Sequence, residues 1–538
     1  MHLRTDTTQS NAHFAKAPSI QAPRSGFSIA KKHVTTMQFD LLYPLFTKFI
    51  YPGDTIAGSM EVATRLTTQV SYLYDDLYMD LHAWFVPMRL IQTNWSRYQF
   101  NAQPGGPTQD NSSLTSPKVN FADLVAGKYG DKSLYDYLGY LTQYDFSART
   151  QHHNNYIARG YNLIWNEAYR DQNLQDPVQV DLDDGPDNPL QYVLLKRGKR
   201  HDKFTSCLPW PQKGQTDVGV SVAMSGSPLV TRVPNALAWK AYVDGTDTGS
   251  ASGTAVTTNG TFQIQQANII SLDPVGGLTV NLGQGLASFL VDDLRYSVSV
   301  KHLLEADARG GTRDVESIQN RWNVTVPDFR LQRPEYLGGA TFTLDGNIVP
   351  QTSETGTTPQ ATLTSFSQGM SGLNVNHSFV EHGVMMILAS ARSNITYQFG
   401  MRRELQYNTR FDWYQPEFAN IGEVAVLNKE IYAGSVDSVA DDIFGYQEYG
   451  YELRYEENMV TGEMRSAYAL SRDNKHMADD YTAGVPALDD QWIQSDTPIE
   501  RNITVDTATA DPLEVNSLFR GKAVRVIPMY SIPGLTRL

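Results

Sequence analysis

The chain has very little cysteine and little charge, and both shortages limit what it can be. Cys207 is the single cysteine among 538 residues, which excludes an intrachain disulfide and a zinc site built from several thiolates. A lone thiol fits folding in a reducing cytosol. Charged residues make up 19% of the chain, below the usual quarter, and this favours a protein with extensive contact surface.

The sequence also lacks long apolar runs. No stretch of about 18 apolar residues occurs, so no membrane span is predicted. His13, Lys16 and Arg24 interrupt the amino-terminal stretch in which a secretory signal needs its apolar core. We therefore expect a chain that does not insert into a membrane and is made without Sec-type export.

Motifs for catalysis are missing as well. Gly127-Lys128 and Gly521-Lys522 lack the upstream glycine and the following hydroxyl residue of a phosphate-binding loop. Gly283-Gln284-Gly285 lacks the third glycine of a dinucleotide fingerprint, and neither a Gly-x-Ser-x-Gly elbow nor a His-Glu-x-x-His pair occurs. We therefore expect no enzyme. The alternative is a β-sandwich carbohydrate-binding module or glycan-active enzyme, which needs a carboxylate pair in a cleft.

Aromatic residues, in contrast, are abundant, with 29 tyrosines in the chain. They are densest in residues 411–461, where they alternate with carboxylates and a few glycines. Buried protein–protein interfaces favour Tyr, Trp, Phe and Arg, so this segment predicts contacts between copies of the chain. The candidate inter-subunit residues are Trp413, Tyr414, Phe418, Phe444, Tyr446, Tyr449, Tyr451, Arg454 and Tyr455.

Charge is distributed unevenly along the chain. The net charge is −14, yet Asp6 is the only acid in residues 1–38. The basic residues of this stretch are Arg4, Lys16, Arg24, Lys31 and Lys32. Because mobile cations near phosphate release counterions without a fixed pocket, they are the candidate DNA-facing residues. The alternative is a plain disordered tail.

Two further charged segments stand out. Residues 196–203 form the densest basic run, which could contact phosphates or pair with carboxylates of a neighbouring subunit. Asp181, Asp183, Asp184 and Asp187 form the one candidate cation site, because calcium prefers several carboxylate oxygens on a flexible loop. Their spacing departs from an EF-hand, so the sequence predicts either a structural calcium ion or a solvated acidic loop. No other cofactor is expected.

Periodicity indicates a mainly β chain with a few short helices. Residues 78–86 alternate between apolar and polar side chains, which predicts a half-buried strand. Residues 161–168 carry apolar side chains at i, i+3, i+4 and i+7. Val300, Leu303 and Leu304 share an apolar face within residues 300–304, so the sequence predicts two helices. Further predicted strands are 340–344, 384–389, 395–399, 424–427 and 523–528. Short strands with very long connections favour a two-sheet jelly roll, whose loops leave from its two ends.

Residues 218–289 differ from the rest of the chain, because they are rich in Ser, Thr, Gly, Ala and Val and poor in charge. Strand-like pieces at 236–243 and 261–270 predict an inserted β-rich module, and the alternative is a long disordered loop. We therefore divide the chain into an arm (1–32), a first part of the body with helical loops (33–217), the insertion (218–289) and the rest of the body (290–538).

Short distinctive motifs are spread over most of the chain. They include Tyr51-Pro52-Gly53-Asp54-Thr55, Trp84-Phe85-Val86-Pro87-Met88-Arg89, Tyr161-Asn162-Leu163-Ile164-Trp165-Asn166-Glu167, His201-Asp202-Lys203-Phe204-Thr205-Ser206, Arg333-Pro334-Glu335-Tyr336-Leu337-Gly338-Gly339 and Pro528-Met529-Tyr530. These motifs resemble those of the major capsid proteins of gokushoviruses, small single-stranded DNA bacteriophages of the Microviridae. Their number and order carry the resemblance from about Ser28 to the end of the chain.

The resemblance implies an eight-stranded viral jelly-roll β-sandwich that self-assembles into a T = 1 icosahedral shell of sixty copies. It also implies a circular single-stranded DNA genome inside, with residues 1–32 facing it, and a small basic packaging protein as a partner. The insertion at 218–289 is expected to form protrusions at the three-fold axes that contact a host cell-surface receptor. The expected location is the virion, assembled in the host bacterial cytoplasm.

Overall fold

A computed structural model describes residues 23–100, 114–147, 153–213, the short strands between 223 and 288, 291–309 and 332–530 except a few single positions. It divides into two compact units: Met1–Pro211 with Trp322–Leu538, and Gln212–Arg321. The expected arm and the last residues of the chain fall largely outside the described ranges. The first unit contains the body of the protein.

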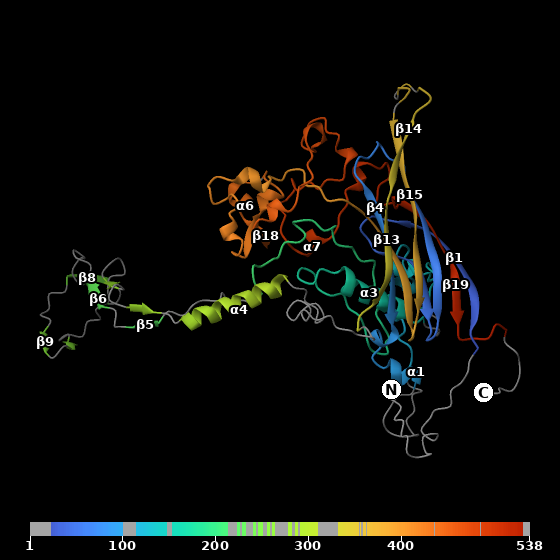
Figure 1. Cartoon of the computed structure of the whole chain (residues 1–538), viewed down its shortest axis with the longest axis horizontal. Coiled ribbons are helices and arrows are strands. Elements are labelled where there is room, and N and C mark those ends of the chain that lie inside the picture. The colour runs from blue at the N-terminus through green and yellow to red at the C-terminus, as the bar shows by residue number, and fades with distance from the viewer. Residues whose placement is uncertain are drawn as a thin grey trace, which may run out of the picture. The chain divides into compact units, whose positions relative to one another are not determined.

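The body is built on two antiparallel sheets (Figure 1). The five-stranded sheet has the order β1 (Ser25–Met37), β19 (Leu513–Arg525), β3 (Thr55–Leu66), β15 (Leu363–Ser378), β14 (Asp345–Pro350). The four-stranded sheet has the order β13 (Glu335–Thr343), β4 (Leu77–Pro87), β16 (Gly383–Ser393), β2 (Tyr43–Ile50). The prediction of a mainly β sandwich is confirmed.

The strands wind between the sheets in jelly-roll order. Along the chain, β1, β3, β15 and β19 belong to one sheet and β2, β4, β13 and β16 to the other, so the chain repeatedly crosses between layers. The strand β14 is added at the edge of the five-stranded sheet, beside β15. Because β1 begins at Ser25, the folded body starts inside the segment that we expected to be a flexible arm. This boundary is corrected: backbone pairing with β19 orders residues 25–32.

Two long excursions leave the four-stranded sheet. The first excursion, residues 88–334, connects β4 to β13, and the second excursion, residues 394–512, connects β16 to β19. Pro87 at the end of β4 pairs with Gly383, whereas Ser393 at the end of β16 pairs with Leu77. The two excursions therefore begin at opposite ends of the same sheet.

The main core lies between the sheets. It joins inward-facing side chains of both sheets, among them Phe46, Met60, Leu81, Ile387 and Phe519, all at most 2% exposed. Phe46 and Phe519 stack with ring centroids 4.3 Å apart. Inward residues alternate along each strand because side chains of a strand point to opposite faces.

A second core covers the outer face of the four-stranded sheet. The first excursion supplies α3 (Tyr156–Ile164), which continues as a π-helical turn at Trp165–Tyr169, so the predicted helix at 161–168 is confirmed. Tyr161, Ile164 and Trp165 pack on the outward side chains of β4 and β16. The strand at residues 78–86 is therefore not half-buried as predicted, because a helix covers the face that the alternation left polar.

A third core joins the two excursions. Phe204 and Cys207 of the first excursion pack against Val426, Phe444 and Trp492 of the second. The second excursion contains the hairpin β17 (Glu423–Leu427) and β18 (Ile443–Glu448) and the short helices α6 (Asp437–Ala440) and α7 (Asp490–Ile493). The strand predicted at 395–399 is wrong, because Tyr397 and Phe399 form only isolated bridges.

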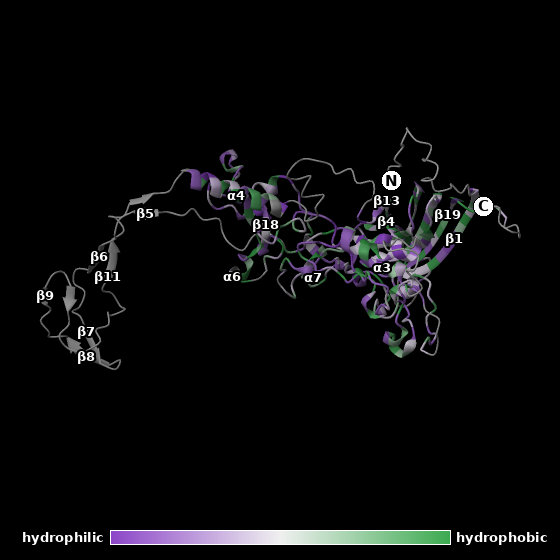
Figure 2. Ribbon diagram, turned by 90° about the horizontal axis from the view of Figure 1, so that it is seen from below, coloured by the Kyte–Doolittle hydropathy of each residue, from purple (hydrophilic) through white to green (hydrophobic). Residues whose placement is uncertain are grey.

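The outer face of the five-stranded sheet is different, because its side chains are exposed. In β1 and β19 exposed residues alternate with less exposed ones, and hydrophobic and hydrophilic positions are interspersed (Figure 2). Val34 and Met370 on this face are 66% and 72% exposed. We call it the bare face.

The second unit contains most of the expected insertion. It holds the strand pairs β5–β12, β6–β11, β7–β8 and β9–β10 and the helix α4 (Val291–Arg309), which confirms the helix predicted at 300–304. The strands are β5 (Ala223–Ser225), β6 (Leu229–Arg232), β7 (Lys240–Val243), β8 (Thr246–Ser250), β9 (Val256–Thr258), β10 (Thr261–Gln263), β11 (Leu278–Asn281) and β12 (Leu286–Ser288). β7 and β10 lie within the two predicted strand-like pieces.

Candidate functional site

The aromatic-rich segment forms an exposed cluster on the second excursion. Phe411, Trp413 and Tyr414 are 57%, 61% and 39% exposed. Tyr414 stacks on Tyr449 with ring centroids 5.2 Å apart, and the ring centroids of Trp413 and Tyr407 are 5.1 Å apart. We call Tyr407, Phe411, Trp413, Tyr414, Phe418 and Tyr449 the aromatic surface.

Local hydrogen bonds and one glycine hold the aromatic surface in place. The Asp412 carboxylate accepts from the backbone amides of Asn408 and Thr409 at 2.8 and 2.6 Å, which fixes the turn before Trp413. Gly450 has φ +78°, and a Cβ there would lie 2.9 Å from the Tyr414 ring. The rings are therefore presented in a fixed arrangement, which lowers the entropy lost on contact with a partner.

Two of the predicted inter-subunit residues are not on the surface. Phe444 and Tyr451 are each 5% exposed and belong to the third core. Phe444 packs edge-on against Trp492 at 4.9 Å, and the Tyr451 hydroxyl donates to Glu430 at 2.7 Å. Their expected role is corrected, because burial inside the protomer removes them from contact with another copy.

The other predicted contact residues are partly or well exposed. Tyr446 is half-buried, and its backbone forms a bridge with Leu208 that links the excursions. Arg454 is exposed and pairs with Glu448, while Tyr455 is 37% exposed. Polar groups next to the aromatic surface, such as Glu452, which accepts from the Tyr407 hydroxyl at 3.1 Å, are typical of the rim of a protein interface.

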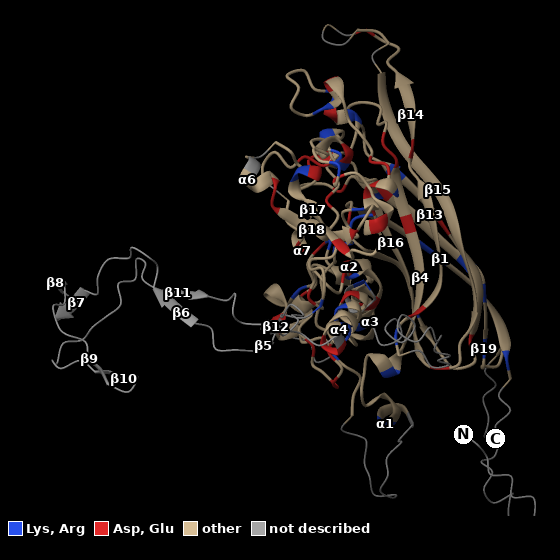
Figure 3. Cartoon of the chain, turned by 60° about the vertical axis from the view of Figure 1, so that its left-hand side comes forward, with Lys and Arg blue, Asp and Glu red and all other residues tan. Residues whose placement is uncertain are grey.

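The basic run at residues 196–203 is used mostly inside the chain. Arg197 donates to Asp80 at 2.6 Å, and Lys199 Nζ lies 2.8 Å from Asp479. Lys203 pairs with Glu430 at 3.3 Å. Acidic and basic residues intermingle around β16, β17 and α7 (Figure 3). These pairs join the first excursion to the sheet and to the second excursion, so carboxylates of the same chain take the place of those expected from a neighbour.

The Lys203–Glu430 pair is the most enclosed of these. The two side chains are 6% and 0% exposed, and Glu430 also accepts from the Tyr451 hydroxyl. Burial and the neighbouring Glu430 carboxylate raise the pKa of Tyr451, so its hydroxyl stays protonated and donates. Breaking such a buried pair costs roughly 3–5 kcal/mol, because one charge is left without a partner.

Two carboxylates of the acidic loop, Asp183 and Asp187, pair with the guanidinium group of Arg159, and a calcium ion at this loop stays a prediction. Arg159 is fully buried, and its Nε donates to Asp187 Oδ2 at 2.7 Å. Asp183 lies 3.2 Å from the same arginine, and Asp184 accepts from Gln92 at 2.6 Å. Asp181 accepts from the Tyr192 hydroxyl at 3.0 Å. The alternative of a solvated loop is wrong for Asp187, which is 2% exposed.

The residues that the structure describes contain no clustered set of metal-ligating side chains. Among those residues no group of three or more His, Cys, Asp or Glu side chains could hold a metal ion. Cys207 is buried, and burial raises the pKa of its thiol. None of the described helices is long and apolar enough to cross a membrane.

The described basic residues near the amino terminus lie at one end of the bare face. Arg24 donates to the Gly53 carbonyl, and Lys32 is exposed on β1. Lys31 is also exposed on β1, with its ammonium nitrogen 5.6 Å from the Phe46 ring centroid. Lys31 therefore remains accessible, and its contact with DNA stays a prediction. Arg4 and Lys16 lie outside the described residues.

Two basic residues at this end were not anticipated. Arg520 and Lys522 on β19 are exposed and pair in register with Ala30 and Ser28 of β1. Residues directly opposite in an antiparallel pair point to the same face, so Lys32, Arg520 and Lys522 share the bare face. In the sequence, Arg520 and Lys522 are two residues apart, which puts them on one face of a strand. Only the pairing of β19 with β1 shows that Lys32 lies on the same face. We call Lys32, Arg520 and Lys522 the basic end.

Three curated proteins are similar to the chain over nearly its whole length. Capsid protein VP1 of Bdellovibrio phage phiMH2K is 38% identical over 537 residues, covering 97% of this chain and 98% of that protein. The VP1 capsid proteins of Chlamydia phage 1 and Spiroplasma virus 4 are 32% and 33% identical and cover 98% and 96% of this chain. Coverage of those two proteins is 98% and 96%.

A protein family described as Capsid protein (F protein) matches residues 15–535. The match spans the sandwich, both excursions and the second unit. The role of such proteins is structural, which excludes the glycan-active enzyme considered as the alternative. The chain belongs to the capsid protein (F protein) family of bacteriophages.

Proposed function

We propose that the chain is the major capsid protein of a T = 1 icosahedral shell, in which sixty copies enclose a circular single-stranded DNA. Membership of the capsid family supports self-assembly. Closed shells need heterologous contacts whose rotations close about symmetry axes, so each copy must present complementary surfaces. The resemblance to gokushovirus capsid proteins supplies the shell geometry and the genome type.

The aromatic surface is the observation that carries the proposed contact between copies. Each aromatic side chain buries about 150–250 Å² when covered, and Tyr and Trp retain a polar group at the edge. Aromatic anchors surrounded by a polar rim are typical of residues that dominate binding energy. The surface is also rigid before contact, because Asp412 and Gly450 hold its backbone.

The basic end is the proposed genome contact. Lys32, Arg520 and Lys522 give one end of the bare face a positive charge on a chain whose net charge is −14. Positive side chains that follow a phosphate backbone bind it without reading sequence. Arg4 and Lys16 of the preceding segment extend this charge along the chain. A small basic packaging protein supplies further positive charge, since the acidic body repels the genome.

The remaining parts of the proposal concern the host. The β-rich insertion at 218–289 forms protrusions at the three-fold axes and contacts a host cell-surface receptor. Assembly takes place in the host bacterial cytoplasm, and a chain with one buried cysteine suits that reducing compartment. The finished protein resides in the virion.

The assembly proposal is tested by replacing two exposed aromatics together, Phe411→Ala with Trp413→Ala. We expect wild-type protein to sediment as megadalton particles and the double variant as protomers or small oligomers, because two contact anchors are lost. The unfolding temperature is expected to stay within a few degrees, since both side chains are more than half exposed.

Tyr468→Ala is the matched control, because Tyr468 is 50% exposed on the same excursion but lies outside the aromatic surface. Electron microscopy of the same fractions shows whether closed shells form. Normal shells from the double variant contradict the proposed role of the aromatic surface.

A further inference from the structure

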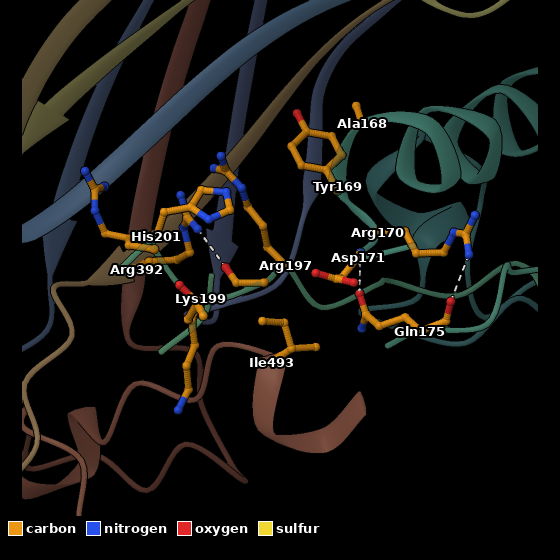
Figure 4. Close-up of a pocket in the computed structure, with 13 residues that line it drawn as sticks. Ala168, Tyr169, Arg170, Asp171, Gln175, Arg197, Lys199, His201, Arg392 and Ile493 are labelled. Atoms are coloured by element: carbon orange, nitrogen blue, oxygen red, sulfur yellow. Dashed lines mark hydrogen bonds between the residues drawn. The ribbon is translucent and has the colours of Figure 1, made fainter. Parts of the chain in front are cut away.

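A cavity of about 500 Å³ opens between the outer face of the four-stranded sheet and the two excursions. Figure 4 shows its lining, which comes from three parts of the body. The first excursion supplies residues 168–175 and 197–205, β16 supplies Arg392, and α7 supplies Ile493. The excursions leave opposite ends of the sheet and meet again around this cavity.

The cavity carries more positive than negative charge. Arg197, Arg200 and Arg392 all line it. Their guanidinium nitrogens lie 2.6, 3.9 and 2.7 Å from the carboxylate of Asp80, which stands behind the lining on β4. Among the described residues, Asp80 is the carboxylate that these three arginines share. One negative charge therefore faces three positive charges.

The second carboxylate at the cavity is already engaged by backbone. Asp171 is the one acid among the described lining residues. Its Oδ1 accepts from the amides of Asn173 and Leu174 at 2.8 and 3.1 Å, which closes a local turn. Lys199 also lines the cavity, but its Nζ bonds to Asp479 and the Tyr481 hydroxyl. Counting only the arginines and the two acids, a net positive charge remains.

Arg392 shows that this charge is incompletely compensated. Its side chain is 8% exposed, and it donates to the Gly198 carbonyl and to Asp80, each at 2.7 Å. Its Nε has no hydrogen-bond partner among the described residues. Burial, and then repulsion from Arg197, lowers the pKa of Arg392 to about 10. Burying an arginine under these conditions is unfavourable unless an anion offsets the charge.

The arginines are held in fixed orientations by neighbouring rings. The Arg197 guanidinium lies 5.2 Å from the centroid of Tyr169, and that of Arg200 lies 4.1 Å from the centroid of Tyr78. The Tyr169 hydroxyl is itself fixed, because the Trp84 indole donates to it at 3.1 Å. A site whose donors are already oriented loses little entropy when an anion binds.

We propose that this cavity binds an oxyanion of the phosphate class and that the bound anion holds the two excursions together. Arginine is the side chain best suited to such a ligand, because its planar fork of N–H groups matches phosphate oxygens. Several guanidinium groups that converge from different elements suit a tetrahedral anion with acceptors in several directions. The phosphate is either free in solution or part of a nucleic-acid strand.

The test uses the full-length protein and inorganic phosphate as the probe. At constant ionic strength, we expect phosphate to raise the unfolding temperature above the value in chloride alone, because it binds the folded state only. Calorimetric titration is expected to give saturable binding. Arg200→Gln should weaken that binding about tenfold or more, since it removes a charged donor that is partly exposed and makes no short hydrogen bond.

Arg65→Gln is the matched control, because Arg65 is an exposed arginine on β3, in the other sheet. A short single-stranded DNA provides the second arm: binding that phosphate displaces and Arg200→Gln weakens identifies a nucleic-acid phosphate, whereas binding of phosphate alone identifies the free ion. Equal effects of phosphate and chloride overturn the proposal. So does a variant Arg200→Gln that breaks up particles without changing phosphate binding, since this points to a carboxylate of a neighbouring copy.

Discussion

The outer faces of the two sheets differ in what covers them. The chain covers the four-stranded sheet itself, with α3 at one end and the basic run at the other, and β16 is buried along nearly its whole length. The five-stranded sheet keeps a bare face with exposed residues at alternate positions of β1 and β19. In a protein that must both fold alone and assemble, one face serves the protomer, and the other remains available to the particle.

Two matched alanine substitutions, one on each outer face, test the difference between the two sheets with the largest expected effect. Leu388 on the covered face is 1% exposed, whereas Met370 on the bare face is 72% exposed. We expect Leu388→Ala to lower the free energy of unfolding by about 2–5 kcal/mol, because it removes buried carbon and leaves a cavity. Met370→Ala should change it by no more than about 0.5 kcal/mol.

Urea unfolding of the two variants measures both values in the isolated protomer. Equal losses contradict the distinction between the covered and the bare face. A loss for Met370→Ala that appears only in assembled particles sharpens it, because it shows that another molecule covers the bare face there.

A smaller change in the free energy of unfolding is expected when the pH is lowered, because His82 lies on the covered face. Burial, followed by repulsion from Arg197, lowers the pKa of His82 to about 4, from its ordinary 6.5. The unfolded chain therefore binds a proton between pH 6.5 and 4 that the folded chain does not. The contribution of neutral His82 to the free energy of unfolding is therefore fully present above pH 6.5 and is lost as the pH falls towards 4. Between pH 7 and pH 5 the loss is about 1–2 kcal/mol.

Replacing His82 by Gln is expected to reduce the difference between the urea midpoints at pH 7 and pH 5. Asp80 does not interfere in this window. Arg197 and Arg392 outweigh the effect of burial and lower the pKa of Asp80 to about 2, so its contribution is lost only below pH 4. An unchanged pH dependence in His82→Gln contradicts the buried neutral state of this histidine.

The smallest effect on stability is expected at the basic end of the bare face. Replacing Lys32, Arg520 and Lys522 together by Gln should leave the unfolding temperature nearly unchanged, since all three are exposed. The same change should lower the DNA content of purified particles, measured as the ratio of nucleic acid to protein, because phosphate contacts are lost. The matched control replaces Arg65 on β3 by Gln. Particles with normal DNA content contradict a genome contact at the basic end.

The two sheets also differ in how well the sequence predicts them. The continuous apolar run at 384–389 predicts β16 correctly, because a strand buried on both faces needs apolar side chains at every position. The strand β15 has Ser, Asn and Gly at many positions, and its pattern gives little indication of a strand. Its outward residues lie on the bare face, so burial does not select them, and backbone pairing with β3 and β14 defines the strand.

The candidate sites show the same limit. Trp413 and Tyr451 come from one aromatic-rich segment, yet one is exposed and the other is buried against Glu430. Composition identifies such a segment but does not separate surface from core. The partner of Asp187 is Arg159, on the helix α3, and no spacing rule connects the two. The arginine cavity likewise joins Arg197 and Arg392, which only the folded chain brings together.

A reconstruction of purified particles by electron microscopy tests the division between folding and assembly surfaces most directly. We predict a closed icosahedral shell in which the Phe411–Phe418 loop lies at a boundary between copies and the basic end of the bare face lines the interior. A stable monomer, or a shell with the aromatic loop on its open exterior and the basic end facing outward, contradicts it.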